Sequence, residues 1–156
     1  MEPISKHVDP FKIAGISART SNANEADPKK ALLPSLWRRF YDEDVMVKIP
    51  LRITGSPIYS VYSNYESDMN GEYDVTVGVQ ISETNAPQKD FSVVEVGGGE
   101  HLVFNEKGEM PHAVAETWRK VWDFFAKDQA PKRKYSSDFE MYYKGSDSIE
   151  VYIAVE

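Results

Sequence analysis

The chain has 156 residues, enough for one domain with a sizeable core, and a composition of 41% hydrophobic and 28% charged residues that is typical of a soluble globular protein. A formal net charge of −7 argues against direct nucleic-acid binding, and the absence of cysteine excludes disulfides, thiol catalysis and zinc–thiolate sites. Since there is neither a membrane-length apolar run nor the apolar stretch of a signal peptide, we expect a cytoplasmic protein with no membrane partner.

The first half of the chain predicts a strand, a helix and a hairpin, in that order. Residues 11–20 alternate as a strand does, and Leu33, Leu36, Trp37 and Phe40 recur at helical spacing. Pro34 either kinks this helix or marks its start. The segment 45–56 is ambiguous, whereas 57–67 and 72–82 are two strands joined by a turn at Asn70-Gly71.

The second half repeats this order after a linker at 84–90. FSVVEV and HLVFNE flank a run of three glycines and form either a hairpin or a bulged strand. The clearest helix of the chain follows in EMPHAVAETWRKVWDFFAKD, and DFEMYY and IEVYIAV close the sequence as two strands. The basic cluster Lys132-Arg133-Lys134 is expected on a solvated face or at a helix end.

The spacing of aromatic residues indicates an internal duplication. Phe11, Trp37 and Tyr62 match Phe91, Trp118 and Tyr142 with offsets of 80, 81 and 80 residues. We therefore expect an α+β fold in which a duplicated β-α-β-β unit, with repeats at about 8–84 and 88–156, forms one antiparallel sheet. Two helices on one face would leave a central groove at the pseudo-twofold axis, a common location for a ligand.

Glu140 lies among aromatic residues in the predicted strand 134–145. Alternation places Asp138, Glu140 and Tyr142 on one face and Phe139, Met141 and Tyr143 on the other, and one of these faces should be buried. Glu140 is then either a solvated strand residue or a partly buried carboxylate that faces the groove. In the second case, tyrosines could donate hydrogen bonds to it, and a lipophilic cation could supply the missing charge.

Other candidate sites are weaker. Taken singly, Trp37, Trp118 and Trp122 are expected in the core, although tryptophans on two helices that flank one groove could also face a ligand. The glycine run leads into a strand rather than a helix, so it does not form a phosphate-binding loop. The three histidines have no metal-ligand spacing, and we assign no metal and no cofactor.

The chain resembles the GyrI-like effector-binding proteins over about residues 8 to 156. The resemblance is carried by the strand pair IYSVYSNYESDMNGEYDVTVGVQIS, the helix segments LPSLWRRF and AETWRKVW, and the closing RKYSSDFEMYY and IEVYIAV. This domain forms the C-terminal ligand domain of several AraC-type and MerR-type multidrug-responsive regulators, and it also occurs free-standing, for instance in integron cassettes.

The resemblance implies an SHS2-like fold with an eight-stranded sheet, two long helices and a groove that binds hydrophobic, often cationic compounds. By position in the family motifs, the ligand-binding residues would be Glu140, Trp37, Tyr62, Trp118, Tyr142 and, less securely, Trp122. Regulators of this family carry a helix-turn-helix domain. This chain has no room for one, so we expect a free-standing ligand domain whose regulatory partner, if it has one, is unknown.

The sequence thus predicts a small-molecule binding protein and not an enzyme. One alternative is a hydrolase of cyclopropane-bearing compounds, because relatives with a similar pocket use the groove glutamate as a general base, and Glu140 and Tyr142 would then be catalytic. Another is a protein that binds DNA gyrase through an acidic surface. The acidic residues are spread along the chain rather than gathered in one block, so this alternative ranks below the other two.

Overall fold

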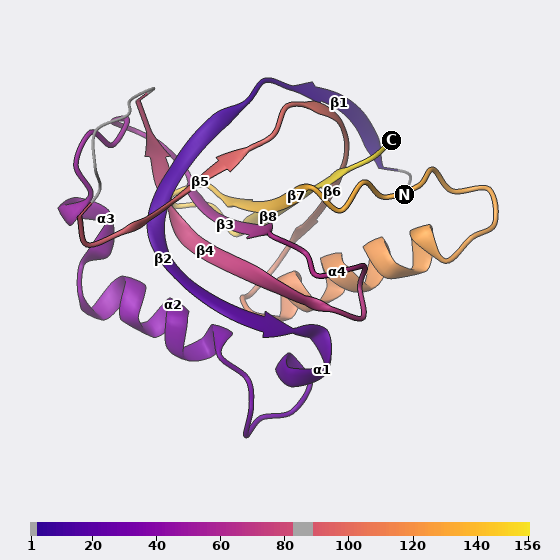
Figure 1. Cartoon of the computed structure of the whole chain (residues 1–156), viewed down its shortest axis with the longest axis horizontal. Helices are drawn as coiled ribbons and strands as arrows, with labels where there is room; N and C mark the ends of the chain where they lie inside the picture. Colours follow the sequence, from indigo (N-terminus) through magenta and orange to yellow (C-terminus); the bar gives the residue numbers. More distant parts are fainter. Residues whose placement is uncertain (1–2, 83–88) are drawn as a thin grey trace.

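The computed structural model describes residues 3–82 and 89–156 and contains an eight-stranded sheet with helices on one face (Figure 1). The strands are β1 Ile4–Val8, β2 Phe11–Ser21, β3 Ile58–Ser63, β4 Glu72–Ile81, β5 Ser92–Val96, β6 Gly99–Lys107, β7 Ser137–Tyr142 and β8 Ser148–Ala154. The helices are α1 Asn22–Glu25, α2 Leu33–Asp42, α3 Val45–Lys48 and α4 His112–Phe125. The expected linker at 84–90, with the expected repeat boundaries at 84 and 88, lies mostly outside the described residues.

The sheet is symmetric about its centre. Its order is β1-β6-β8-β7-β3-β4-β2-β5, and all neighbouring strands pair antiparallel. Counting outward from the central β3–β7 pair, β4 corresponds in position to β8, β2 to β6 and β5 to β1. Ser60 and Glu140, the residues related by the 80-residue offset, are direct Cα partners in that central pair. The duplicated unit and the eight-stranded antiparallel sheet are confirmed, with the first strand of each unit divided in two.

Both long helices pack on the same face of the sheet. The apolar side of α2 buries Leu36 and Phe40 against β2 and β4, whereas α4 buries Val121 over β6 and β8. Pro34 lies in the first turn of α2, where its missing N–H costs no hydrogen bond, so the helix begins there and is not kinked. Of the ambiguous segment 45–56, Val45–Lys48 forms the short helix α3 and the rest contains no helix or strand of its own.

The opposite face of the sheet is also buried, because the strands curl around a second core (Figure 1). This core contains Ile13, Tyr59, Val61, Val96, Val103, Phe139 and Tyr152. Alternation required one face of the strand around Glu140 to be buried, and both faces are. Phe139 is 2% exposed on one face and Glu140 is 2% exposed on the other.

One alternative is excluded and one expectation needs correction. FSVVEV and HLVFNE, expected as a hairpin or a bulged strand, do not form the hairpin, since β5 pairs with β2 at one edge of the sheet and β6 pairs with β1 and β8 near the other. Phe11 and Phe91 are not equivalent: Phe11 packs in the second core beside Tyr59, and Phe91 packs against the α2 side. The duplication holds where the central strands and the helices fix the register, but not at these two phenylalanines.

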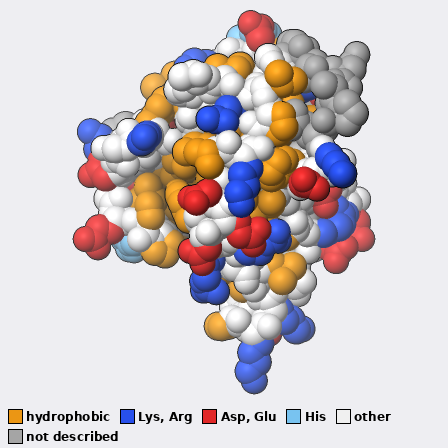
Figure 2. Space-filling model, turned by 90° about the vertical axis from the view of Figure 1, so that its left-hand side faces the viewer, with side chains coloured by type: hydrophobic (Ala, Val, Ile, Leu, Met, Phe, Trp, Pro, Cys, Tyr) orange, Lys and Arg blue, Asp and Glu red, His pale blue; other side chains and the backbone are white. Residues whose placement is uncertain are grey.

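The surface mixes charges of both signs. On the face shown in Figure 2, basic and acidic side chains are interspersed, with hydrophobic patches between them. Within the described ranges, no helix has the length and apolar character needed to cross a membrane.

Candidate functional site

The candidate site lies where the two central strands pass beneath the gap between α2 and α4. Alternation along β3 and β7 directs Tyr62, Glu140 and Tyr142 toward the helices. Because β3 and β7 pair antiparallel across the pseudo-twofold axis, Tyr62 lies beside Glu140 and Tyr142 although about 80 positions separate it from them in the sequence.

Glu140 is buried and receives three hydrogen bonds. Tyr62 Oη donates to Oε2 at 2.9 Å, Trp118 Nε1 donates to Oε2 at 2.7 Å, and Tyr142 Oη donates to Oε1 at 2.6 Å. The side chain is therefore not the solvated strand residue that alternation also allowed. Hydrogen bonds from three neutral donors offset part of the cost of removing a carboxylate from water.

Burial raises the pKa of Glu140, although the hydrogen bonds from Tyr142, Trp118 and Tyr62 lower it in part. Burial and the nearby Glu140 also raise the pKa values of Tyr62 and Tyr142 well above that of a free tyrosine, so both phenols stay protonated as donors. Within the part of the chain that the structure describes, no lysine, arginine or histidine forms an ion pair with Glu140. The carboxylate is thus solvated by neutral groups and has no counter-ion among the described residues.

The aromatic side chains are exchanged between the two repeats. The Trp37 ring on α2 lies 5.2 Å from the ring of Tyr142, which belongs to the second repeat. The Trp118 ring on α4 lies 5.1 Å from the ring of Tyr62, which belongs to the first. This reciprocal packing supports the matches of Trp37 with Trp118 and of Tyr62 with Tyr142, and it surrounds the carboxylate with aromatic rings.

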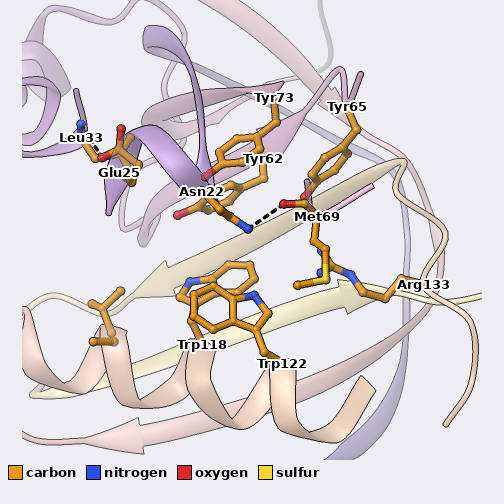
Figure 3. A pocket seen from close by; sticks show the side chains of 12 residues that line it. Asn22, Glu25, Leu33, Tyr62, Tyr65, Met69, Tyr73, Trp118, Trp122 and Arg133 are labelled. Atoms are coloured by element: carbon orange, nitrogen blue, oxygen red, sulfur yellow. Dashed lines mark hydrogen bonds between the residues drawn. The ribbon is translucent and has the colours of Figure 1, made fainter. Parts of the chain in front are cut away.

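A groove runs between α2 and α4 above these residues. Its larger part, the Glu140 cavity, has a volume of about 540 Å³ and is lined by Glu25, Leu33, Pro34, Trp37, Tyr41, Tyr62, Met110, Pro111, Val114, Glu140 and Tyr142. A neighbouring Trp118 cavity of about 200 Å³ contains Trp118 and Trp122 on one wall and tyrosines from β3, β4 and the β3–β4 connection on the other (Figure 3). Glu25, Leu33, Tyr62 and Val114 line both cavities, so the two form one continuous groove.

All six residues expected at the site line this groove. Trp37, Tyr62, Glu140 and Tyr142 surround the Glu140 cavity, whereas Trp118 and Trp122 line its neighbour. Trp122 is 40% exposed and lies one helical turn from Trp118, with the two ring centroids 6.2 Å apart.

Glu25 is a groove residue that the sequence interpretation missed. Its carboxylate accepts hydrogen bonds from the backbone N–H groups of Leu32 and Leu33 and from the Thr20 hydroxyl, and so it caps the start of α2. An acidic residue seven to eight positions before a helix is a weak signal, because side-chain caps are normally sought directly next to the helix.

A second buried carboxylate lies close to the first. Asp138 is fully buried and forms an ion pair of 2.8 Å with Arg133, whose side chain is only 7% exposed. Tyr65 Oη and the backbone N–H of Ala154 also donate to Asp138. The sequence context predicted that Arg133 lies on a solvated face or at a helix end. Arg133 instead neutralises a buried acid beside the groove.

In residues 3–82 and 89–156, no group of three or more histidine, aspartate or glutamate side chains is arranged to hold a metal ion. The groove offers aromatic surface and carboxylates, which are features suited to an organic ligand.

Comparisons with known proteins agree with this fold. The family model described as GyrI-like small molecule binding domain matches residues 1–156. YobU of Bacillus subtilis (strain 168), whose name proposes a role in transcriptional regulation, is 28% identical over 156 residues that cover 96% of this chain and 95% of YobU.

Two solved structures share the fold over nearly the whole chain. The integron cassette protein VCH_CASS2 from the mobile metagenome of Vibrio cholerae superposes with a TM-score of 0.82 at 32% identity, covering 99% of this chain and 96% of that one. SAV2435, solved with tetraphenylphosphonium bound, superposes with a TM-score of 0.81 at 22% identity, covering 100% and 94%. The chain belongs to the GyrI-like family of small-molecule binding domains.

Proposed function

We propose that the groove binds hydrophobic cations and that Glu140 is the counter-ion of the bound ligand. The observation that carries the proposal is a carboxylate 2% exposed, held by three neutral donors and without an ion-pair partner among the described residues. A buried charge of this kind is stabilised further by an opposite charge, and the groove above it is large enough for an organic cation.

The aromatic walls favour the same class of ligand. Trp37, Tyr62 and Tyr142 border the Glu140 cavity, and a cation over an aromatic face gains about 0.5–2 kcal/mol. For a groove of this size and character we expect binding of about −8 kcal/mol, which is a micromolar dissociation constant. The tetraphenylphosphonium bound to SAV2435 is a hydrophobic cation, and this supports the proposal for the present chain.

The test is a fluorescence titration with two ions of the same shape and opposite charge. Trp37, Trp118 and Trp122 are the only tryptophans of the chain and all line the groove, so intrinsic fluorescence reports occupancy. Tetraphenylphosphonium should give a saturable change, tetraphenylborate should not, and neutral triphenylphosphine oxide should bind more weakly than the cation.

The matched variants are Glu140→Gln and Glu95→Gln, which change the net charge equally. Glu95 lies exposed on the edge strand β5, so its replacement should leave binding unchanged. Glu140→Gln should weaken tetraphenylphosphonium by about 2 kcal/mol or more, about thirtyfold in Kd, and leave triphenylphosphine oxide nearly unaffected. Equal losses for the cation and the neutral compound would overturn the electrostatic role of Glu140.

Binding is favoured over catalysis because donors already occupy both oxygens of Glu140. A general base needs a free lone pair directed at water, and of about four lone-pair sites on a carboxylate three are used here. We further propose that the domain acts in the stand-alone form, since the match with YobU covers 95% of that protein. A regulatory partner and an interaction with gyrase stay predictions.

A further inference from the structure

The groove does not end at the Trp118 cavity. An Arg133 cavity of about 420 Å³ follows the C-terminal end of α4, and Met69, Trp122 and Arg133 line both cavities. The three cavities therefore form one path from Glu140, past the two tryptophans of α4, to Arg133. In Figure 3, Met69 and Arg133 lie on the side of Trp122 away from Leu33 and Glu25.

The two ends of this path are lined by charged residues of opposite sign, of which Arg133 is already paired with Asp138 and Lys132 is not. Among the described residues that line the Glu140 cavity, the charged ones are Glu25 and Glu140, and none is basic. Among those that line the Arg133 cavity, the charged ones are Lys132 and Arg133, and none is acidic. Apolar and aromatic side chains line the Trp118 cavity between these ends, and Trp122, Phe125 and Tyr135 also line the Arg133 cavity.

Pairing with Asp138 uses one terminal nitrogen of Arg133, and the Nε–H is buried without an acceptor in the described part of the chain. The guanidinium is held 4.4 Å from the ring centroid of Tyr135, and a guanidinium has five N–H donors in all. The neighbouring Lys132 is exposed and forms no ion pair with any described residue, so it adds an uncompensated positive charge.

We infer that the groove takes elongated zwitterionic amphiphiles, with the cationic group at Glu140 and a carboxylate in the Arg133 cavity. This inference rests on the proposed binding of cations and adds a second subsite to it. The carboxylate meets the exposed Lys132 beside the paired guanidinium of Arg133, while the connecting chain passes Trp122. The second subsite also accounts for Trp122, whose 40% exposure is unusual for a tryptophan and which forms a wall of both adjoining cavities.

The probes are triphenylphosphonium cations whose fourth substituent is an alkyl chain ending in a carboxylate. Each is compared with its methyl ester over a series of chain lengths, and methyltriphenylphosphonium serves as the cation without a tail. At one chain length the carboxylate should bind about tenfold more tightly than its ester, because a charge-assisted hydrogen bond replaces a neutral contact. At shorter lengths the carboxylate cannot reach the subsite and the advantage should disappear.

Substitutions outside the Glu140 cavity locate the carboxylate. Arg133→Gln leaves Asp138 buried without its partner and is unsuitable, so the first variant is Lys132→Gln, with Lys134→Gln as its matched control two positions away. Lys132→Gln should reduce the tenfold advantage to about threefold, and Lys134→Gln should preserve it. Ala126→Trp, placed at the exposed end of α4, should fill the cavity and abolish the advantage without changing the affinity for methyltriphenylphosphonium.

The outcomes separate the two proposals. If methyltriphenylphosphonium binds through Glu140 but no carboxylate probe exceeds its ester, the second subsite is wrong and the cation site stands. An advantage that persists in Ala126→Trp also overturns the subsite, because the carboxylate then lies elsewhere. If methyltriphenylphosphonium does not bind, or binds Glu140→Gln equally well, the proposed function fails and the zwitterion inference fails with it.

Discussion

Asp138 and Glu140 lie two residues apart on β7, on the same face of the sheet, and their residues are 0% and 2% exposed. Asp138 has a counter-ion within the protein, Arg133, together with donors from Tyr65 and Ala154. In the described ranges, the side-chain partners of Glu140 are the neutral donors Tyr62, Trp118 and Tyr142. Two equally buried acids are thus stabilised in different ways within one strand.

The difference separates a structural carboxylate from one that is suited to a ligand. A buried ion pair is complete, and removing one partner exposes the full desolvation cost of the other. A buried carboxylate without a counter-ion keeps part of that cost, and the same burial raises the pKa of Glu140. A cation that enters the groove would remove this cost, so the fold holds a site whose electrostatic balance depends on its ligand.

The largest effect is expected where the complete pair is broken. Arg133→Gln leaves Asp138 buried without a counter-ion and should lower the free energy of unfolding by about 3–5 kcal/mol. Urea denaturation followed by circular dichroism measures this loss. Lys134→Gln removes the same charge from an exposed neighbour and should change stability by less than about 0.5 kcal/mol.

The double variant Arg133→Gln/Asp138→Asn removes both charges and should recover a large part of the lost stability, since no unpaired charge is then left buried. A loss below about 1 kcal/mol in Arg133→Gln would show that water reaches Asp138, and the contrast between the two carboxylates would be lost.

A smaller effect is expected when Glu140 loses one of its donors. Tyr142→Phe keeps the ring against Trp37 but removes the hydrogen bond to Glu140 Oε1. In urea denaturation, this should lower the free energy of unfolding by about 1–2 kcal/mol. The pKa of Glu140 should rise further, because the bond from Tyr142 lowers it in the intact protein. Tyr143→Phe, on the neighbouring exposed tyrosine, is the control, and a loss no greater in Tyr142→Phe than in this control would contradict the assigned bond.

The sequence predicted the faces of β7 and the aromatic partners of Glu140 better than it predicted charge pairing. Alternation placed Glu140 and Tyr142 together, and helical spacing placed Trp37 and Trp118 on apolar helix faces. Alternation gives only the direction of a side chain, so it could not decide whether Glu140 is solvated or buried. The burial depends on α2 and α4 closing over the strand, which is a tertiary property.

The pair of Arg133 and Asp138 could not be found from local pattern. Between two lysines, Arg133 has the sequence context of a solvated cluster, and Tyr65 is separated from Asp138 by 73 positions. The Glu25 cap and the positions of β5 and β6 were missed for the same reason. Each depends on which distant segments meet, and this is set by the curl and register of the whole sheet.

The smallest change in stability, and the most informative sign, is expected for Glu140→Gln without ligand. The variant breaks no ion pair within the described chain, and its amide oxygen still accepts hydrogen bonds. At neutral pH its free energy of unfolding should therefore lie within about 1 kcal/mol of the wild-type value or exceed it.

The folded chain binds the Glu140 proton more tightly than the unfolded chain, because the pKa is raised on folding. Below the unfolded pKa, about 4.3, both states are protonated and the group contributes no penalty. As the pH rises from there through the folded pKa, the wild type loses stability relative to the variant, and then the difference becomes constant.

Thermal denaturation of both proteins between pH 4 and pH 8 measures this difference in stability. A difference that is constant or falls with pH would contradict a buried carboxylate without a counter-ion. Saturating tetraphenylphosphonium should reverse the order at neutral pH, since the cation binds the wild type about thirtyfold more tightly and therefore stabilises it more than the variant.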